Sequence, residues 1–110
     1  MAGLLRNIDL NLLAVFDVLW SERSVSRAAG RLHRTQSAVS LALDRLRTTF
    51  DDPLFVWNGR EMQPTAHAEA LAPRVRAIIN QVNDTLEFEF DDPRKARRDF
   101  TIATADYIDW

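Results

Sequence analysis

The sequence contains no cysteine and only two histidines among its 110 residues. Without cysteine, neither a disulfide nor a thiolate metal site can form. His33 and His67 have no cluster of carboxylates around them at metal-ligand spacing. We therefore expect no metal and no cofactor. We interpret His33 as a turn residue and His67 as part of the first turn of a helix.

Long hydrophobic runs are also missing. No segment approaches the roughly 18 consecutive apolar residues of a membrane-spanning helix. The opening MAGLLRNIDL has neither the apolar centre nor the small-residue cleavage site of a secretory signal. We expect a cytoplasmic protein with no membrane partner.

The residues of an enzyme site are missing as well, because no nucleophile, base and oxyanion-binding group can be assembled. Asp51 and Asp52 are neighbouring carboxylates, but at the end of a helical pattern they are typical of a helix stop. We therefore predict that the chain is not an enzyme.

The net charge of −2 by itself argues against a nucleic-acid partner. The positions of the charged residues along the chain, however, favour such a partner. Between Arg23 and Arg47 the chain has six arginines and a single acid, Asp44. Between Asp84 and Trp110 it has eight acids and four bases, which hide the basic segment in the total. The basic segment favours binding to phosphates.

The basic segment also carries two short helical patterns separated by a polar break. The apolar positions recur at intervals of three and four, as on one face of a helix: Val25, Ala28, Ala29 and Leu32, then Val39, Leu43, Leu46 and Phe50. Thr35 has the chemistry of an N-cap for a second helix starting at Gln36. Ala28, Ala29 and Gly30 are small enough for the first helix to cross closely beneath the second. This pattern predicts a helix-turn-helix.

The flanking segments complete a winged domain. Ile8 to Glu22 predicts a scaffold helix with Asp9 as its N-cap. Pro53 ends the helical pattern, and a hairpin is expected next. Its strands are Leu54–Trp57 and Arg60–Gln63, joined by the turn pair Asn58-Gly59.

A long helix follows, from Ala66 to about Glu87, with Thr65 as its N-cap. Pro73 lies inside it and predicts a kink or a break. An apolar stripe along the helix predicts dimerisation through Leu71, Val75, Ile78, Val82 and Leu86, with packing of the stripe on its own domain as the alternative. Beyond a charged connector, Phe100–Ala105 alternates like the first strand of a second domain that the chain does not include.

These features predict a mainly α fold: a winged helix-turn-helix, with a three-helix core and a two-stranded wing, followed by a long dimerisation linker helix. We predict that residues 1–65 form the DNA-binding domain and 66–90 the linker helix, and that 91–110 hold a connector and the start of a truncated further domain, which the resemblance described below implies is an effector-binding domain.

The outward, N-terminal part of the second helix is the part that enters the major groove in helix-turn-helix proteins. We predict base readout by Gln36, Ser37, Ser40 and Leu41. For the DNA backbone we predict contacts from Arg34, Thr35, Arg45 and Ser26, and for the minor groove a contact from Arg60 at the wing tip. Arg27 and Arg31 are weaker candidates, since they can simply solvate the preceding helix.

The order of elements, with SVSRAAGRLHRTQSAVSLALDRLR and DDPLFVWNGREMQPT, resembles the amino-terminal DNA-binding region of LysR-type transcriptional regulators over roughly residues 8–105. IDLNLLAVFDVL and FDDPLF resemble the branch of nodulation-gene activators and regulators of aromatic-compound degradation. The resemblance implies a homodimer on an interrupted palindromic promoter site and leaves a tetramer open at full length. It also implies a small-molecule inducer, aromatic in this branch, bound by the missing effector domain.

The chain departs from the common pattern of that family at three positions. Ser37 replaces a frequent proline, Leu41 replaces a frequent arginine or glutamine, and Trp57 replaces a frequent arginine. Leu41 can contact a thymine methyl group instead of a polar base edge. Two other hypotheses remain open from the sequence: an architectural protein that binds DNA without sequence preference, and a dimerisation module that binds protein.

Overall fold

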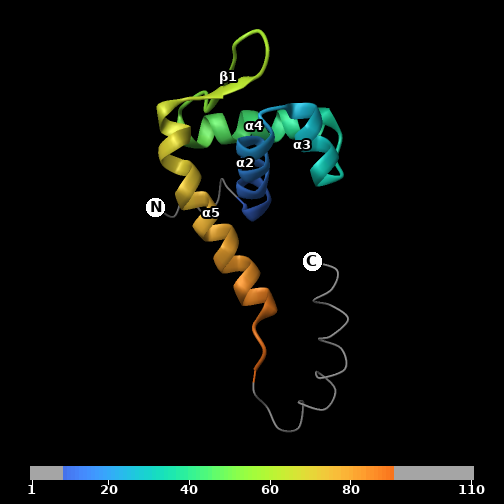
Figure 1. The fold of residues 1–110 in the computed structure, drawn as a ribbon, viewed down its shortest axis with the longest axis vertical. Helices are drawn as coiled ribbons and strands as arrows, with labels where there is room; N and C mark the ends of the chain where they lie inside the picture. The colour runs from blue at the N-terminus through green and yellow to red at the C-terminus, as the bar shows by residue number, and fades with distance from the viewer. Residues whose placement is uncertain (1–8, 91–110) are drawn as a thin grey trace.

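The computed structural model describes residues 9–90, and its elements follow the predicted order (Figure 1). The elements are α2 (Leu10–Glu22), α3 (Val25–Leu32), α4 (Gln36–Phe50), β1 (Phe55–Trp57), β2 (Met62–Pro64) and α5 (Ala66–Glu87). Figure 1 shows α2, α3 and α4 gathered below the hairpin, while α5 leaves from beside it and extends away. The predicted winged helix-turn-helix followed by a long helix is confirmed.

Each of the four described helices begins at a residue whose side-chain oxygen accepts a hydrogen bond from the backbone amide three residues later. The capping residues are Asp9, Ser24, Thr35 and Thr65. These bonds satisfy amide groups that have no partner within the helix. The caps predicted at Asp9, Thr35 and Thr65 are therefore confirmed. His33 ends α3 in the left-handed conformation, with φ of 54°, and its role as a turn residue is also confirmed.

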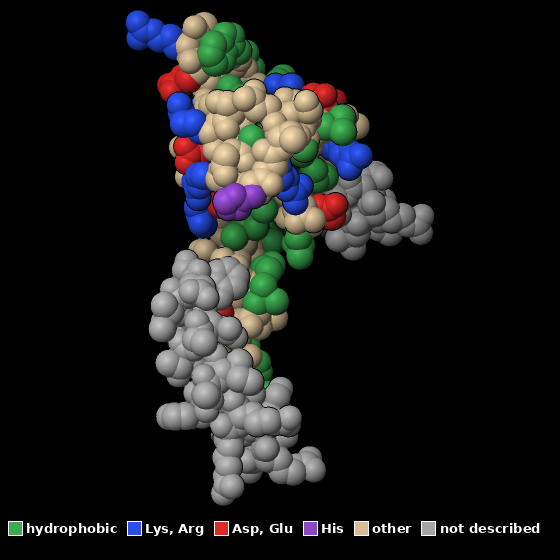
Figure 2. All heavy atoms as spheres, turned by 90° about the vertical axis from the view of Figure 1, so that its right-hand side faces the viewer, with side chains coloured by type: hydrophobic (Ala, Val, Ile, Leu, Met, Phe, Trp, Pro, Cys, Tyr) green, Lys and Arg blue, Asp and Glu red, His purple; other side chains and the backbone are tan. Residues whose placement is uncertain are grey.

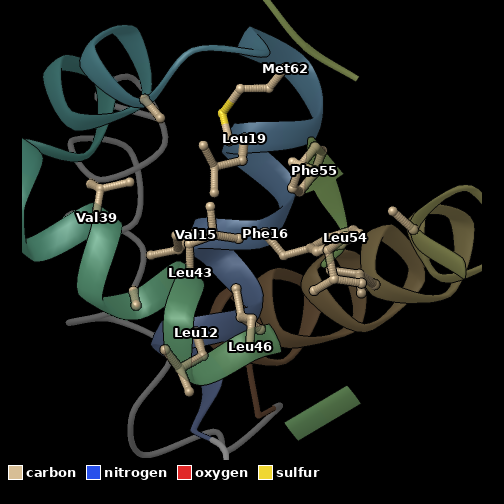
Figure 3. Packing of buried hydrophobic residues seen from close by; sticks show 14 of the residues in the cluster. Leu12, Val15, Phe16, Leu19, Val39, Leu43, Leu46, Leu54, Phe55 and Met62 are labelled. Carbon is tan, nitrogen blue, oxygen red and sulfur yellow. The ribbon is translucent and has the colours of Figure 1, made fainter. Parts of the chain in front are cut away.

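The core forms where α2, α4 and the wing meet (Figure 3). Phe16 of α2 and Phe55 of β1 are fully buried, with ring centroids 5.5 Å apart. Leu43 and Leu46 bring the inner face of α4 into the same cluster. Burying each such side chain contributes about 1.5–3 kcal/mol, so the core determines which face of α4 points outward.

Gly30 does not lie at a helix crossing, and that part of the sequence interpretation is wrong. Ala28 and Ala29 are buried as predicted, but Gly30 is exposed. A Cβ atom added to it would meet nothing within 4 Å. Successive helical residues are turned by about 100°, so a third consecutive residue leaves the contact face.

The wing is an antiparallel pair in which Phe55 lies opposite Pro64 and Trp57 opposite Met62. Its loop has four residues, 58–61, so the predicted two-residue turn and the return strand Arg60–Gln63 are wrong. The reason is Asn58, whose side-chain oxygen accepts from the amides of Arg60 and Glu61, both at 3.0 Å. These bonds hold Arg60 in the loop.

Helix α5 runs without interruption through Pro73, so the alternative of a break is wrong. Proline removes one helical hydrogen bond, at a cost of about 3 kcal/mol in an isolated helix. Here Ala68 and Ala72 before it and Val75 after it are buried against the domain. Packing on both sides of the proline keeps the helix continuous.

The predicted strand Phe100–Ala105 and most of the charged connector lie outside the described residues. Between residues 9 and 90, none of the helices combines the length and the apolar character needed to cross a membrane.

Candidate nucleic-acid interface

The first turns of α4 present a polar face that the core leaves uncovered. Gln36, Ser37 and Ser40 are exposed, and Leu41 is 57% exposed although it is apolar. Val39, Ala42, Leu43 and Leu46 occupy the opposite, buried face. The cap bond from the Ala38 amide to Thr35 Oγ1, 3.1 Å long, determines where the helix begins. The structure therefore brings together, on one outward surface, the residues predicted to read bases.

A hollow of about 180 Å³ lies between this face and the start of α2. Arg34, Leu41 and Arg45 line one side of it, and Asp9 and Asn11 line the other. The local sequence pattern indicates only a capping role for Asp9 and no role for Asn11. Their proximity to the recognition face depends on how α2 packs against α4, and no local pattern in the sequence indicates it.

Four of the six arginines in the basic segment have partners within the domain. Arg23 lies over the Trp20 ring, 4.5 Å from its centroid. Arg27 and Arg31 form ion pairs with Glu22, at 3.4 and 3.0 Å. Arg47 Nε donates to the Pro53 carbonyl and its Nη2 to the Phe55 carbonyl, both at 2.8 Å.

Within residues 9–90, the side chains of Arg34 and Arg45 have no hydrogen bond or ion pair, and both are exposed. Arg34 and Arg45 thus differ from Arg27 and Arg31, whose guanidinium groups pair with Glu22. Seen from the side of α3, arginine side chains, with some Asp and Glu side chains among them, lie around an area of uncharged polar side chains and backbone (Figure 2). Guanidinium groups without a protein partner are suited to phosphate.

Ser26 is also exposed, at the start of α3, with its hydroxyl 3.3 Å from that of Ser24. Arg60 is exposed in the wing loop, and within the described residues its side chain has no ion pair. Ser26, Arg60 and the two unpaired arginines remain candidates for DNA contact.

Asp52 joins the end of α4 to the start of α5. Its Oδ2 accepts from the Thr65 hydroxyl at 2.6 Å and from the Leu54 amide at 2.8 Å. These two bonds, with the nearby charge of His67 as a smaller cause, hold the pKa of Asp52 below its ordinary value, against the opposing effect of desolvation. The sequence interpretation of Asp52 as a helix stop missed this role. His67 does lie in the first turn of α5, as predicted.

The apolar stripe of α5 divides into two parts. Val75 is only 3% exposed and packs in its own domain, so predicting it as a dimer contact is wrong. Leu71 also packs partly against that core. The second half of the stripe is open: Ile78 and Leu86 are 42% and 68% exposed. They line an apolar groove of about 480 Å³ with Leu10, Ala77, Gln81, Val82 and Thr85.

No group of three or more His, Cys, Asp or Glu side chains able to hold a metal is present among residues 9–90. In the same range, every buried side-chain nitrogen or oxygen has a hydrogen-bond partner.

Residues 10–69 match the family model described as bacterial regulatory helix-turn-helix protein, lysR family. The chain belongs to this family. It is a LysR-type helix-turn-helix DNA-binding domain, as the motifs predicted, and not an enzyme. LysR regulators bind promoter DNA and act as oligomers.

Two curated relatives lie in the branch that the sequence indicated. The chain is 42% identical over 104 residues to nodulation protein D 2 of Rhizobium tropici, covering 94% of this chain and 33% of the relative. It is 46% identical over 103 residues to the HTH-type transcriptional activator NahR of Pseudomonas putida, covering 93% and 34%. This LysR-type chain thus spans about a third of the length of the curated relatives it matches.

A solved structure has the same fold and a similar sequence. The probable transcriptional regulator PA0477 from Pseudomonas aeruginosa superposes with a TM-score of 0.73 at 49% identity. The match covers 77% of this chain and 28% of that one. The similarity to this solved structure shows that the chain shares its fold as well as its sequence pattern.

Proposed function

We propose that this LysR-type domain binds duplex promoter DNA with sequence preference and that α4 reads the bases. The observation that carries the proposal is the exposed outer face of the first turns of α4. Gln36 can pair a donor and an acceptor with an adenine edge, and Leu41 can contact a thymine methyl group. Ser37 and Ser40 offer hydroxyls to bases or phosphates beside them.

Arg34 and Arg45 hold the recognition helix on the DNA backbone. Their guanidinium groups have no partner within residues 9–90, so binding to phosphate breaks no existing ion pair. Each phosphate contact also releases counterions and makes affinity depend on salt. The hydroxyls of Thr35 and Ser26 add contacts to the backbone, and Arg60 enters the minor groove from the wing.

A second copy of this chain covers the apolar groove of α5. The groove lies along the half of α5 that extends away from the domain (Figure 1), and among the described residues outside α5 only Leu10 of α2 lines it. Oligomer formation in LysR regulators supports this choice of occupant. Ile78, Val82 and Leu86 are the contacts we propose. Leu71 contributes less to the dimer contact than these residues, because it already packs partly on its own core.

Two copies related by a twofold axis present two recognition helices, so the bound site is an interrupted palindrome. The relatives are about three times longer than this chain, which supports a further domain in the full-length regulator. We propose that this domain binds a small-molecule inducer of aromatic class. Such a regulator acts on chromosomal promoters and therefore in the cytoplasm.

The experiment that tests DNA recognition is a salt series of binding to a randomised duplex pool, with sequencing of the retained DNA. We expect a palindromic motif to be enriched and the affinity to fall steeply with salt. Salt-sensitive binding without a motif would instead support the architectural hypothesis. No retained DNA at low salt would leave only a protein-binding dimerisation module.

Two variants of α4 separate base readout from general binding. Gln36→Ala should lower the preference for one position of each half-site by about 1–3 kcal/mol and leave the salt slope unchanged. Thr48→Ala is the matched control, since Thr48 is exposed near the other end of the same helix. An unchanged motif in Gln36→Ala would remove that residue from the readout.

The dimer is tested by sedimentation of the chain itself. Ile78→Glu places a carboxylate in the apolar groove and should convert a dimer to a monomer while the domain stays folded. Asn80→Glu adds the same charge at an exposed position outside the groove and should leave the dimer intact. If Ile78→Glu and Asn80→Glu sedimented alike, the dimer contact would not lie in the apolar groove.

A further inference from the structure

Trp57 is the most exposed aromatic side chain of the wing, at 63%. It lies directly opposite Met62, so the two side chains share one face of the hairpin. Phe55, two residues earlier on that face, is fully buried, and Met62 is 8% exposed. Trp57 therefore stands on the inner face of the hairpin, beyond the edge of the core.

The hairpin that carries Trp57 is attached firmly to the recognition helix. Arg47 of α4 donates to the carbonyls of Pro53 and Phe55 at the start of the wing. At the other strand, the Met62 amide donates to the Arg23 carbonyl at 3.3 Å. The backbone at Trp57 consequently has a defined position relative to α4, and little backbone entropy is lost when the side chain binds a ligand.

The neighbours of Trp57 indicate what the ligand is. Arg60 lies in the loop that directly follows Trp57, exposed and without an ion pair among the described residues. A duplex offers apolar C–H surface on its deoxyribose rings, immediately beside the phosphates that attract arginine. An exposed indole on an anchored strand, followed three residues later by an unpaired cation, matches that alternation.

We propose that Trp57 packs its indole against the sugars lining the groove that Arg60 enters, and so adds affinity without adding charge. This inference rests on the proposed function of the domain, because it needs the wing to lie on DNA. An apolar contact releases no counterions. Trp57 therefore strengthens binding equally at low and high salt, whereas Arg60 strengthens it mainly at low salt.

The experiment is a salt series of binding to the enriched duplex with four proteins: wild type, Trp57→Ala, Arg60→Ala and Val56→Ala. Val56 is the matched control, because it is 49% exposed on the opposite face of the same strand. We expect Trp57→Ala to bind about tenfold more weakly at every salt concentration, with an unchanged slope. Arg60→Ala should reduce the slope by about 0.9, and Val56→Ala should behave as wild type.

Trp57→Ala binding within twofold of wild type at every salt concentration would overturn the inference, and so would a slope reduced as in Arg60→Ala. Both results leave the proposed function standing, since wild type still binds. No binding by wild type would refute the proposed function instead.

A fluorescence measurement tests the inference without the alanine variant, so the result does not depend on whether Trp57→Ala folds correctly. In a chain with Trp20→Phe and Trp110→Phe, Trp57 is the sole indole. Its fluorescence should shift to shorter wavelength or be quenched when the duplex is added. An unchanged spectrum at saturating DNA would overturn the inference independently of any variant at position 57.

Discussion

The hydroxyl of Thr65 donates to Asp52 Oδ2 at 2.6 Å and accepts from the Ala68 amide at 3.1 Å. One side chain thus caps α5 and ties it to the loop that follows α4. Asp52 also accepts from the amide of Leu54, a buried residue held at φ of 64°. Left-handed backbone costs a residue such as leucine about 1–2 kcal/mol, which these bonds help to offset.

Asp52→Asn should lower the thermal unfolding midpoint at neutral pH, with a difference from wild type that shrinks in acid. The lowered pKa in the folded state means that ionised Asp52 stabilises the fold above its unfolded pKa of about 3.9. That contribution is lost as pH falls through the folded value. Unfolding followed from pH 7 to pH 2.5 checks this, and a difference that stayed constant with pH would contradict it.

Arg47→Met should destabilise the domain by about 1–3 kcal/mol without changing the salt dependence of DNA binding. Arg47 already donates to the carbonyls of Pro53 and Phe55, so we expect it not to contact phosphate. Arg45→Ala should do the opposite, keeping the stability and reducing the salt slope by about 0.9. Denaturant unfolding and a binding series measure both variants. If Arg47→Met and Arg45→Ala changed the salt slope of DNA binding by similar amounts, the assignment of Arg47 to stability and of Arg45 to phosphate binding would be wrong.

Gly30→Ala should stabilise the chain by about 0.5–1 kcal/mol, because glycine weakens a helix interior and here no neighbour needs its small size. Gly59→Ala is the contrasting variant. Gly59 has φ of 100° in the wing loop, so alanine there is strained although space is available. Denaturant midpoints should therefore move in opposite directions. If Gly30→Ala instead destabilised the chain, that result would support the close helix crossing at Gly30 that the sequence predicts.

Asp9→Asn should raise DNA affinity about two- to fivefold at low salt. Asparagine caps a helix as well as aspartate does, but it removes a negative charge from the hollow shared with Arg34 and Arg45. The gain should fade as salt screens the interaction. Asp84→Asn removes the same charge far along α5 and serves as the control. Equal gains in both variants would show an effect of net charge alone.

Local chemistry in the sequence was sufficient to locate the helices. Thr35 and Thr65 are capping residues followed at once by helix-forming patterns, and both helices begin where those patterns predict. A cap acts within three residues, so it can be recognised without knowing the rest of the fold. The wing loop was less predictable. Asn58-Gly59 favours a two-residue turn, but the Asn58 side chain bonds two amides and widens the loop.

By itself, the sequence determined the order and ends of the helices, the existence of the wing and the family, because capping, periodicity and motif spacing are local. Only the tertiary structure decided which groups are free to act. Arg34 and Arg47 are both basic-segment arginines, yet one is unpaired and the other is held by the wing. Val75 and Ile78 share one stripe, yet only Ile78 is available to a partner. Availability depends on contacts between residues distant in the chain, which no local pattern contains.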